Sequence, residues 1–367
     1  MYGAGMAVIR ASVLEVDRER PLSAARVVSE ELPEPGPGQV RLDVEAFGLS
    51  SNNVSYALLG DTLGHWRPFP AAAGWGRVPA WGLARVTGGD PALVPAGARL
   101  VGYLPMATRF LLTGAPAPAG IEVTAPERDG MLPMYRRMRR IDTDPAWDER
   151  HAGVELQLLP LAPLAALLSR DLLEQEPSQV VVSSASSKTG LVLGRLLRAG
   201  NVRTVGLTGA ARTAEVTRTG AFDEVLAYDR TTSVRGTGGT VYVDISGDPA
   251  ITRAVHEHLG PALIRSVAVG GSHLPGTGTG AGPGGSAGPP GPAPVRFSVG
   301  RRETELLAEL GGATLDRLLA EARATLVGWA ATWMSLRTTD GLDAARADWR
   351  RVAHGGPPGL GAVVVRP

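Results

Sequence analysis

The chain has 367 residues, enough for two domains that each bury a core. Its 37 basic and 36 acidic residues nearly cancel, which argues against nucleic acid or an anionic membrane surface as a partner. It contains no cysteine, which excludes disulfides and thiolate-bound metals.

The beginning of the chain does not have the pattern of a signal peptide, because Arg10, Glu15 and Asp17 interrupt its apolar residues. No stretch reaches the roughly 18 apolar residues of a membrane helix. We therefore expect a cytoplasmic protein. The six histidines are scattered. The nearest two, His256 and His258, are spaced so that they point apart on a helix, and no metal site is expected.

The first part of the chain reads as β-structure. Short strands are predicted at residues 8–16, 25–31 and 39–48, with apolar and polar residues alternating in the third. A Ser/Asn cap predicts a short helix within residues 50–60. Two further strand candidates follow, at residues 79–89 and 98–112, on either side of a Pro/Gly turn.

From about residue 160 the pattern changes to strands that alternate with helices. "QVVVSSASS" is an apolar run that ends in small polar residues, as a buried parallel strand does. This alternation predicts a doubly wound parallel sheet. Residues 270–294 are low-complexity Gly/Pro sequence, which predicts a flexible surface loop. A helical region over 303–336, broken at "LGG", and a final strand at 361–366 complete the expected elements.

This order of elements resembles the medium-chain dehydrogenase/reductase superfamily. "FGLSSNNVSYALLGD", "VPAGARLVGYLP" and "GAFDEVLAYD" are similar to its motifs. A closer resemblance, carried by "GWGRVPAWG" and "SSASSKTG", is to a bacterial family known as a domain of unknown function within that superfamily. The resemblance implies an α/β protein with a GroES-like β-rich domain (1–155, completed by 337–367) and a Rossmann domain (156–336). It also implies a possible homodimer.

The loop after the first Rossmann strand departs from the glycine-rich pattern. Ser184, Ser187 and Gly190 occupy the three glycine positions, so only the last glycine is kept. The Ser187 side chain would crowd a pyrophosphate bound in the ordinary way. Hydroxyl donors, a helix N-terminus and a cation nevertheless remain for an anion. The hydroxyls are those of Ser183, Ser184, Ser186, Ser187 and Thr189, and the cation is Lys188. Lys188 is the single lysine of the chain.

Two interpretations of this loop stay open, since its serines could instead only cap the helix while Lys188 faces solvent. The next strand ends at Thr208 without the Asp or Glu that an NAD site uses on the ribose. Arg212 follows and could meet a 2′-phosphate. If a nicotinamide cofactor binds, NADP is therefore expected, although Arg212 could equally be a solvated surface residue.

In the superfamily, the loop that matches "SSNNVSYALLGD" faces the nicotinamide, and zinc-dependent members place a cysteine ligand nearby. Since this chain has no cysteine, the resemblance implies a zinc-independent enzyme similar to quinone oxidoreductases and enoyl reductases. Tyr56 is then a candidate proton donor, and Asn52 or Asn53 a candidate donor to a carbonyl oxygen. The alternatives are a core aromatic for Tyr56 and helix capping for the asparagines.

His65 lies in the following loop and is a candidate acid–base group, against the alternative of a surface histidine. Trp66, Trp75 and Trp81 flank it; Trp81 is expected in the core, and the other two are candidates for a pocket wall.

The leading hypothesis is an NADP(H)-dependent reductase of an apolar enone or enoyl-type small molecule, with Tyr56 or His65 assisting the proton. Hydride transfer is expected in the cleft between the domains. Two alternatives remain: a non-redox enzyme that binds another phosphate-bearing ligand, such as an acyl-CoA thioester, and a ligand-binding protein without cofactor chemistry.

Overall fold

The computed structural model describes residues 9–269, 288–355 and 360–367. The chain divides into two compact units, of which the first comprises Met1–Leu159 with Met334–Pro367 and the second Pro160–Trp333. The sequence-based boundaries were 155/156 and 336/337, so the structure divides the chain within four residues of each.

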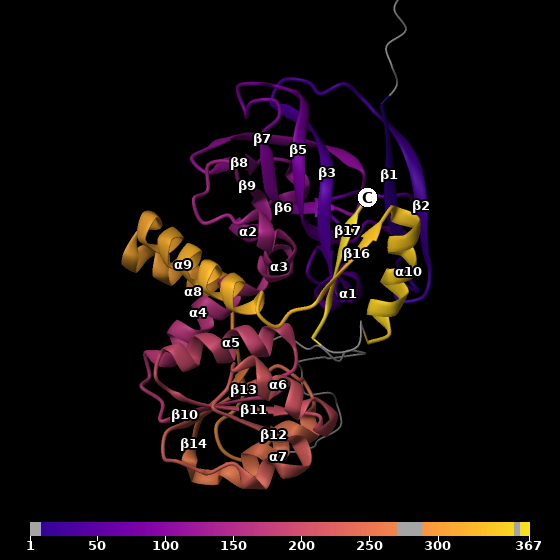
Figure 1. Cartoon of the computed structure of the whole chain (residues 1–367). Coiled ribbons are helices and arrows are strands. Elements are labelled where there is room, and N and C mark those ends of the chain that lie inside the picture. The colour runs from indigo at the N-terminus through magenta and orange to yellow at the C-terminus, as the bar shows by residue number, and fades with distance from the viewer. Residues whose placement is uncertain (1–8, 270–287, 356–359) are drawn as a thin grey trace, which may run out of the picture. The chain divides into compact units, whose positions relative to one another are not determined.

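Six strands of the first unit close into a barrel (Figure 1). They pair in the order β3 (Gln39–Leu49), β5 (Pro79–Gly89), β6 (Arg99–Pro105), β9 (Arg137–Arg140), β8 (Gly120–Val123) and β7 (Arg109–Ala117), and β7 pairs back with β3. Closure removes the free edges that an open sheet exposes. β17 (Ala362–Arg366) pairs with β3 and with β16 (Leu336–Asp340). A second sheet has the order β2 (Ala25–Leu32), β1 (Ile9–Asp17), β4 (Trp75–Gly76).

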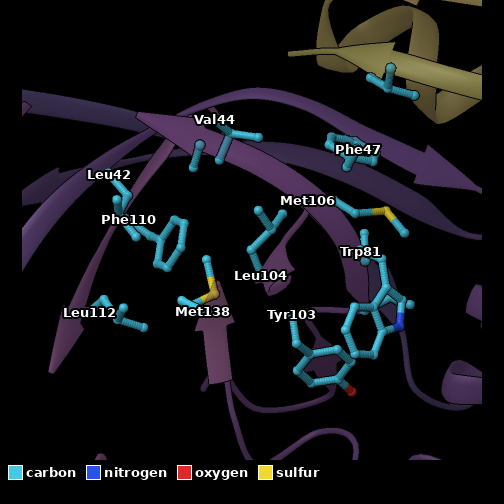
Figure 2. Close-up of a cluster of buried hydrophobic side chains, with 14 of the residues drawn as sticks. Leu42, Val44, Phe47, Trp81, Tyr103, Leu104, Met106, Phe110, Leu112 and Met138 are labelled. Atoms are coloured by element: carbon cyan, nitrogen blue, oxygen red, sulfur yellow. The ribbon is translucent and has the colours of Figure 1, made fainter. Parts of the chain in front are cut away.

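Alternate residues of the barrel strands fill its interior (Figure 2). Val40, Leu42 and Val44 of β3 are buried while their neighbours are only partly so, which matches the period of two seen in the sequence. Phe110 and Leu112 of β7 belong to the same buried cluster. The helices of the first unit pack against its strands; they are α1 (Ser51–Leu58), α2 (Pro133–Arg136), α3 (Ala152–Leu158) and α10 (Leu342–Ala353).

Two predicted elements are wrong. The strand expected at 98–112 is two strands, β6 and β7, because the chain turns back after Pro105. The helical region expected to reach residue 336 ends earlier, as α8 (Val299–Leu310) and α9 (Gly312–Ala330). Leu336 begins β16, which forms by pairing with the distant β17.

The second unit contains a six-stranded sheet whose pairs are all parallel, in the order β12, β11, β10, β13, β14, β15. In chain order this is 3-2-1-4-5-6, the arrangement of a dinucleotide-binding sheet. The strands are Gln179–Val182 (β10), Arg203–Thr208 (β11), Glu224–Ala227 (β12), Thr240–Asp244 (β13), Leu263–Ala268 (β14) and Val295–Arg296 (β15). α4 (Leu161–Leu173) precedes β10, and α5 (Lys188–Ala199), α6 (Thr213–Thr219) and α7 (Pro249–Leu259) lie between strands of the sheet.

The predicted Gly/Pro loop falls mostly outside the described residues, which omit 270–287. Beyond them, the Pro290 carbonyl oxygen lies 2.8 Å from Nδ1 of the buried His256. In the described part of the chain, no single helix is long and apolar enough to cross a membrane, although residues 149–158 and 161–173 together meet that length and composition. Among all residues that the structure describes, no group of three His, Asp or Glu side chains is placed to hold a metal.

Candidate functional site

The loop between β10 and α5 starts α5 with a serine cap. Ser187 has an extended backbone, and its Oγ accepts a hydrogen bond from the Gly190 N–H at 3.0 Å. The capping interpretation therefore holds for Ser187. Lys188 and Thr189 form the first turn of α5, where backbone N–H groups lie outside the helical ladder. The cap thus accounts for one hydroxyl and does not remove an anion site from the helix terminus.

Gly190 keeps the packing role of the third glycine in a dinucleotide loop. A Cβ at this position would lie 2.7 Å from the backbone oxygen of Ser184 and 3.1 Å from Cα of Ala185. Both neighbours are backbone atoms of the loop itself and cannot turn aside. Ser184 has a φ of 51°, a left-handed conformation that glycine adopts more easily. The chain therefore keeps the sharp turn with a serine at its first glycine position.

Two side chains from neighbouring strands hold this loop. Thr208, at the end of β11, donates from Oγ1 to Ser186 Oγ at 3.0 Å. Tyr228, directly after β12, accepts from the Ser184 N–H at 2.9 Å. This bond leaves the hydroxyl hydrogen of Tyr228 available to another acceptor. The sequence motif "EVLAYD" contained Tyr228, but nothing local showed that its hydroxyl reaches the loop.

Lys188 is half-buried at the start of α5. Desolvation lowers the pKa of its ammonium from 10.5 to about 8, so the group is largely protonated at neutral pH. A phosphate beside it would favour the charged form and offset this desolvation.

Arg212 lies directly before α6, and its Nη1 pairs with Glu215 Oε2 at 2.8 Å. The side chain is about one third exposed. A 2′-phosphate at Arg212 would compete with this carboxylate, which weakens the sequence-based case for Arg212.

In the first unit, the candidate loop forms α1 with the predicted cap. Ser50 and Asn53 make a capping box, in which Asn53 Oδ1 accepts from the Ser50 N–H at 2.8 Å. Asn53 Nδ2 donates to the Pro79 carbonyl at 2.9 Å, and its side chain is buried. Both ends of the Asn53 amide are therefore used structurally. Its interpretation as a donor to a substrate carbonyl gives way to the capping alternative.

Tyr56 lies one turn after Asn53 on the buried face of the same helix and contacts a group of aromatic side chains. Only 5% of it is exposed, and its Oη accepts from Trp81 Nε1 at 3.0 Å. Desolvation raises the pKa of the Tyr56 phenol, while hydrogen bonds with Trp81, Asn52 and Tyr135 act in the opposite direction. Three polar groups thus gather around one phenol oxygen and would stabilise its phenolate. Asn52 itself stays half-exposed.

His65 is buried rather than on the surface. Its ring lies 4.3 Å from that of Tyr56, between centroids, and its Nδ1 lies 2.7 Å from Tyr103 Oη. Burial lowers the pKa of His65 from 6.5 to about 4, so the imidazole is neutral at neutral pH. His65 is therefore a poor proton donor under these conditions and instead fixes the hydroxyl of Tyr103.

Three further residues of this aromatic group were not found from the sequence: Tyr103 of β6, Tyr135 of α2 and Arg128. The Tyr135 ring lies 4.8 Å from that of Tyr103 and 5.5 Å from that of His65, between centroids. The guanidinium of Arg128 lies 5.6 Å from the Tyr103 ring centroid. We call Tyr56, His65, Trp81, Tyr103, Tyr135 and Arg128 the phenol cluster.

The two other tryptophans of this region pack against neighbouring parts of the first unit. Trp66 is buried against Gly60 and Gly76, where an added Cβ would lie within 2.5 Å of its ring. Trp75 stacks under the guanidinium of Arg26 at 3.7 Å. Trp81 is in the core, as predicted, and also contributes its N–H to Tyr56.

A family model described as "Protein of unknown function (DUF2855)" matches residues 47–357. The chain belongs to the DUF2855 family. The matched range contains both the phenol cluster and the loop before α5. Among curated protein sequences, none matches this DUF2855 member.

Solved structures resemble this DUF2855 member over nearly its whole length. CurA from Vibrio vulnificus is 15% identical and has a TM-score of 0.61, with 97% of this chain and 98% of CurA covered. A structure of CurA in complex with NADPH gives 14% identity, the same TM-score and coverages of 98% and 99%. A mutant enoyl thioester reductase from Candida tropicalis is 11% identical, with a TM-score of 0.58 and coverages of 98% and 100%. These likenesses confirm the predicted α/β fold with its β-rich and doubly wound parts.

Proposed function

We propose that the protein is an NADP(H)-dependent, zinc-independent reductase of an apolar enone or enoyl-type substrate. One observation carries the chemistry: a buried phenol, Tyr56, whose oxygen is surrounded by the indole N–H of Trp81, the Asn52 side chain and the Tyr135 hydroxyl. Burial raises the pKa of this phenol, and the surrounding hydrogen-bonding groups offset part of that effect by compensating the charge left when the proton is transferred. Two structural neighbours support an assignment to the NADPH-dependent reductases: CurA, which was solved in complex with NADPH, and an enoyl thioester reductase.

The loop before α5 fits a phosphate-bearing cofactor. The Ser187 hydroxyl is turned back to its cap, while Ser186, Lys188, Thr189 and the helix N-terminus supply donors and one positive charge. When bound, NADPH supplies a hydride. This chain's residues then bind its phosphates and deliver a proton from Tyr56, with the Asn52 amide available to the carbonyl oxygen of the substrate.

The proposal is tested by adding NADPH to the purified protein and measuring thermal stabilisation together with nicotinamide fluorescence. Ligand at about 100 times its Kd stabilises a fold by about 2.7 kcal/mol, which is readily measured. Stabilisation by NADPH and less by NADH is the expected result. Failure of NADPH to stabilise a folded protein would contradict the cofactor assignment.

One observation favours a second candidate, which is binding of an acyl-CoA thioester without redox chemistry. Ser187 stands where a dinucleotide loop uses glycine to let the backbone approach the pyrophosphate. In the same assay this candidate predicts stabilisation by acyl-CoA and none by NADPH.

Lys188 gives the cofactor site a specific pH dependence. Its ammonium is present below about pH 8 and is lost as the pH rises through that value. The affinity for NADPH should therefore fall by about tenfold between about pH 7 and pH 9.5, as loss of one charged contact implies. Calorimetric titration at the two pH values measures this fall.

Two variants control for other titrating groups. Lys188→Arg keeps its charge throughout this range, so its affinity should change little with pH. Lys188→Ala should bind weakly at both pH values. Equal affinities in the native protein and in Lys188→Ala would remove Lys188 from the site.

A further inference from the structure

The polar groups around Tyr56 differ in their access to solvent. Tyr56 is 5% exposed, and Trp81, which donates to it, is equally buried. Tyr135 and Asn52 are both half-exposed. A proton lost by Tyr56 must therefore be replaced through one of these two side chains, unless the buried group opens to water.

Of these neighbours, only Tyr135 can pass on a proton within the described cluster. Trp81 is a donor that does not ionise in this pH range, and the Asn52 amide is not an acid. His65 is neutral, and its Nδ1 is held by Tyr103. The Tyr135 phenol is hydrogen bonded with Tyr56, and the residue is partly exposed, although burial raises the pKa of its hydroxyl well above the ordinary value.

The structure holds Tyr135 firmly in this place. α2 is a single turn that begins with Pro133, and Arg128 clamps it to the barrel. Nη1 of Arg128 donates to the Tyr135 carbonyl at 2.6 Å, and Nη2 donates to the Tyr103 carbonyl at 3.0 Å. The Tyr135 ring meets that of Tyr56 edge-on at 6.3 Å between centroids. A short helix with few contacts of its own is thereby fixed beside the phenol that it serves.

Arg128 also adds a positive charge to the cluster. It is 2% exposed, and no carboxylate pairs with it in the described part of the chain. Desolvation lowers its pKa to about 10, which leaves the guanidinium charged at neutral pH. A buried cation that is satisfied by carbonyl oxygens favours a nearby phenolate.

We propose that Tyr135 is a further catalytic residue, a proton relay that restores Tyr56 after each turnover. This inference rests on the proposed function, in which Tyr56 protonates the carbanion left after hydride addition. In that step the Tyr56 O–H bond breaks and a C–H bond of the product forms. The Tyr135 O–H bond then breaks as the Tyr56 O–H bond re-forms. Water finally returns a proton to the Tyr135 phenolate.

The first test uses Tyr135→Phe, which removes the hydroxyl and keeps the ring. The first turnover with NADPH and an apolar enone should keep its rate, because Tyr56 begins protonated. Later turnovers should slow by at least about tenfold, within the range of acid–base effects. Stopped-flow absorbance of NADPH separates the two phases. A steady state as fast as that of the native protein overturns the relay.

The control is Tyr242→Phe, which removes a buried phenol hydroxyl of β13, outside the phenol cluster. Its later turnovers should match those of the native protein. A slowing equal to that of Tyr135→Phe would show a general effect of losing a buried tyrosine hydroxyl and overturn the specific role of Tyr135.

A second test needs no cofactor or substrate. Phenolate absorbance is followed against pH in the native protein, and the Tyr56 ionisation is identified by its absence in Tyr56→Phe. Since hydrogen bonding with Tyr135 lowers the pKa of Tyr56, Tyr135→Phe should move this ionisation to higher pH. An unchanged ionisation refutes the relay contact. If it shifts but Tyr56→Phe retains full reductase activity, the contact stands and the role proposed for Tyr56 fails instead.

Discussion

Tyr56→Phe is expected to lower kcat by roughly 10²–10⁴-fold, the usual contribution of a positioned acid. The ring keeps its contacts with His65 and Tyr103, so the fold should change little. The substitution removes the hydroxyl that accepts from Trp81 and leaves that buried indole N–H without this acceptor, at a cost of about 1–3 kcal/mol. Steady-state rates of NADPH oxidation with an apolar enone, beside thermal unfolding of the same samples, measure the two effects separately.

Comparing kcat with the affinities for substrate and cofactor distinguishes a catalytic from a structural effect of this substitution. An acid that acts only in the transition state changes kcat and leaves the substrate and cofactor affinities nearly constant. A loss of activity that follows a loss of folded protein would argue against the catalytic role. Full activity in Tyr56→Phe would do the same and would direct attention to Asn52 and water.

Gly190→Ala is expected to destabilise the protein by about 1–2 kcal/mol and to weaken NADPH binding. Alanine gains up to about 1 kcal/mol as a helix former. Its Cβ, however, would lie 2.7 Å from the Ser184 carbonyl oxygen, and overpacking costs about 1–3 kcal/mol. The clash should prevail because the neighbour is backbone, and the loop must shift to relieve it. Denaturant unfolding and NADPH titration measure both consequences.

Gly328→Ala is the matched control. Gly328 lies within α9, and a Cβ there would meet no atom within 4 Å. Only the gain in helix propensity remains, so the control should be slightly more stable than the native protein. If both substitutions stabilise equally, the close approach of α5 to its loop is not a constraint.

Local patterns predicted those parts of the fold and site that local forces create. The alternation in β3, the Ser50 cap of α1 and the buried run of β10 are properties of adjacent residues, and the structure contains all three. The predicted helical region ran on to Leu336, the first residue of β16, and the strand itself was not predicted because it owes its conformation to pairing with β17. Non-local hydrogen bonding overrides local preference in such a segment.

Local sequence patterns likewise predicted only part of the phenol cluster. Tyr56 and His65 were recognisable as candidates from one loop, whereas Tyr103, Tyr135 and Arg128 join them only when the barrel closes. The burial that makes His65 neutral has the same origin. Asn53 and Ser187 had two interpretations each, and the hydrogen bonds that they make supported capping for both.

The route of the chain through the first unit affects how the protein is made. β17 completes the sheet beside β3, and Trp349 of α10 is fully buried, with its indole N–H on the Pro21 carbonyl 328 residues earlier. During synthesis one edge of β3 and the Pro21 carbonyl therefore wait for partners that emerge last. The segment Pro160–Trp333 already has its complete sheet by then and can fold while still on the ribosome. A premature stop near the end of translation should release a folded nucleotide-type unit attached to a first unit that lacks β17, a species prone to proteolysis and aggregation.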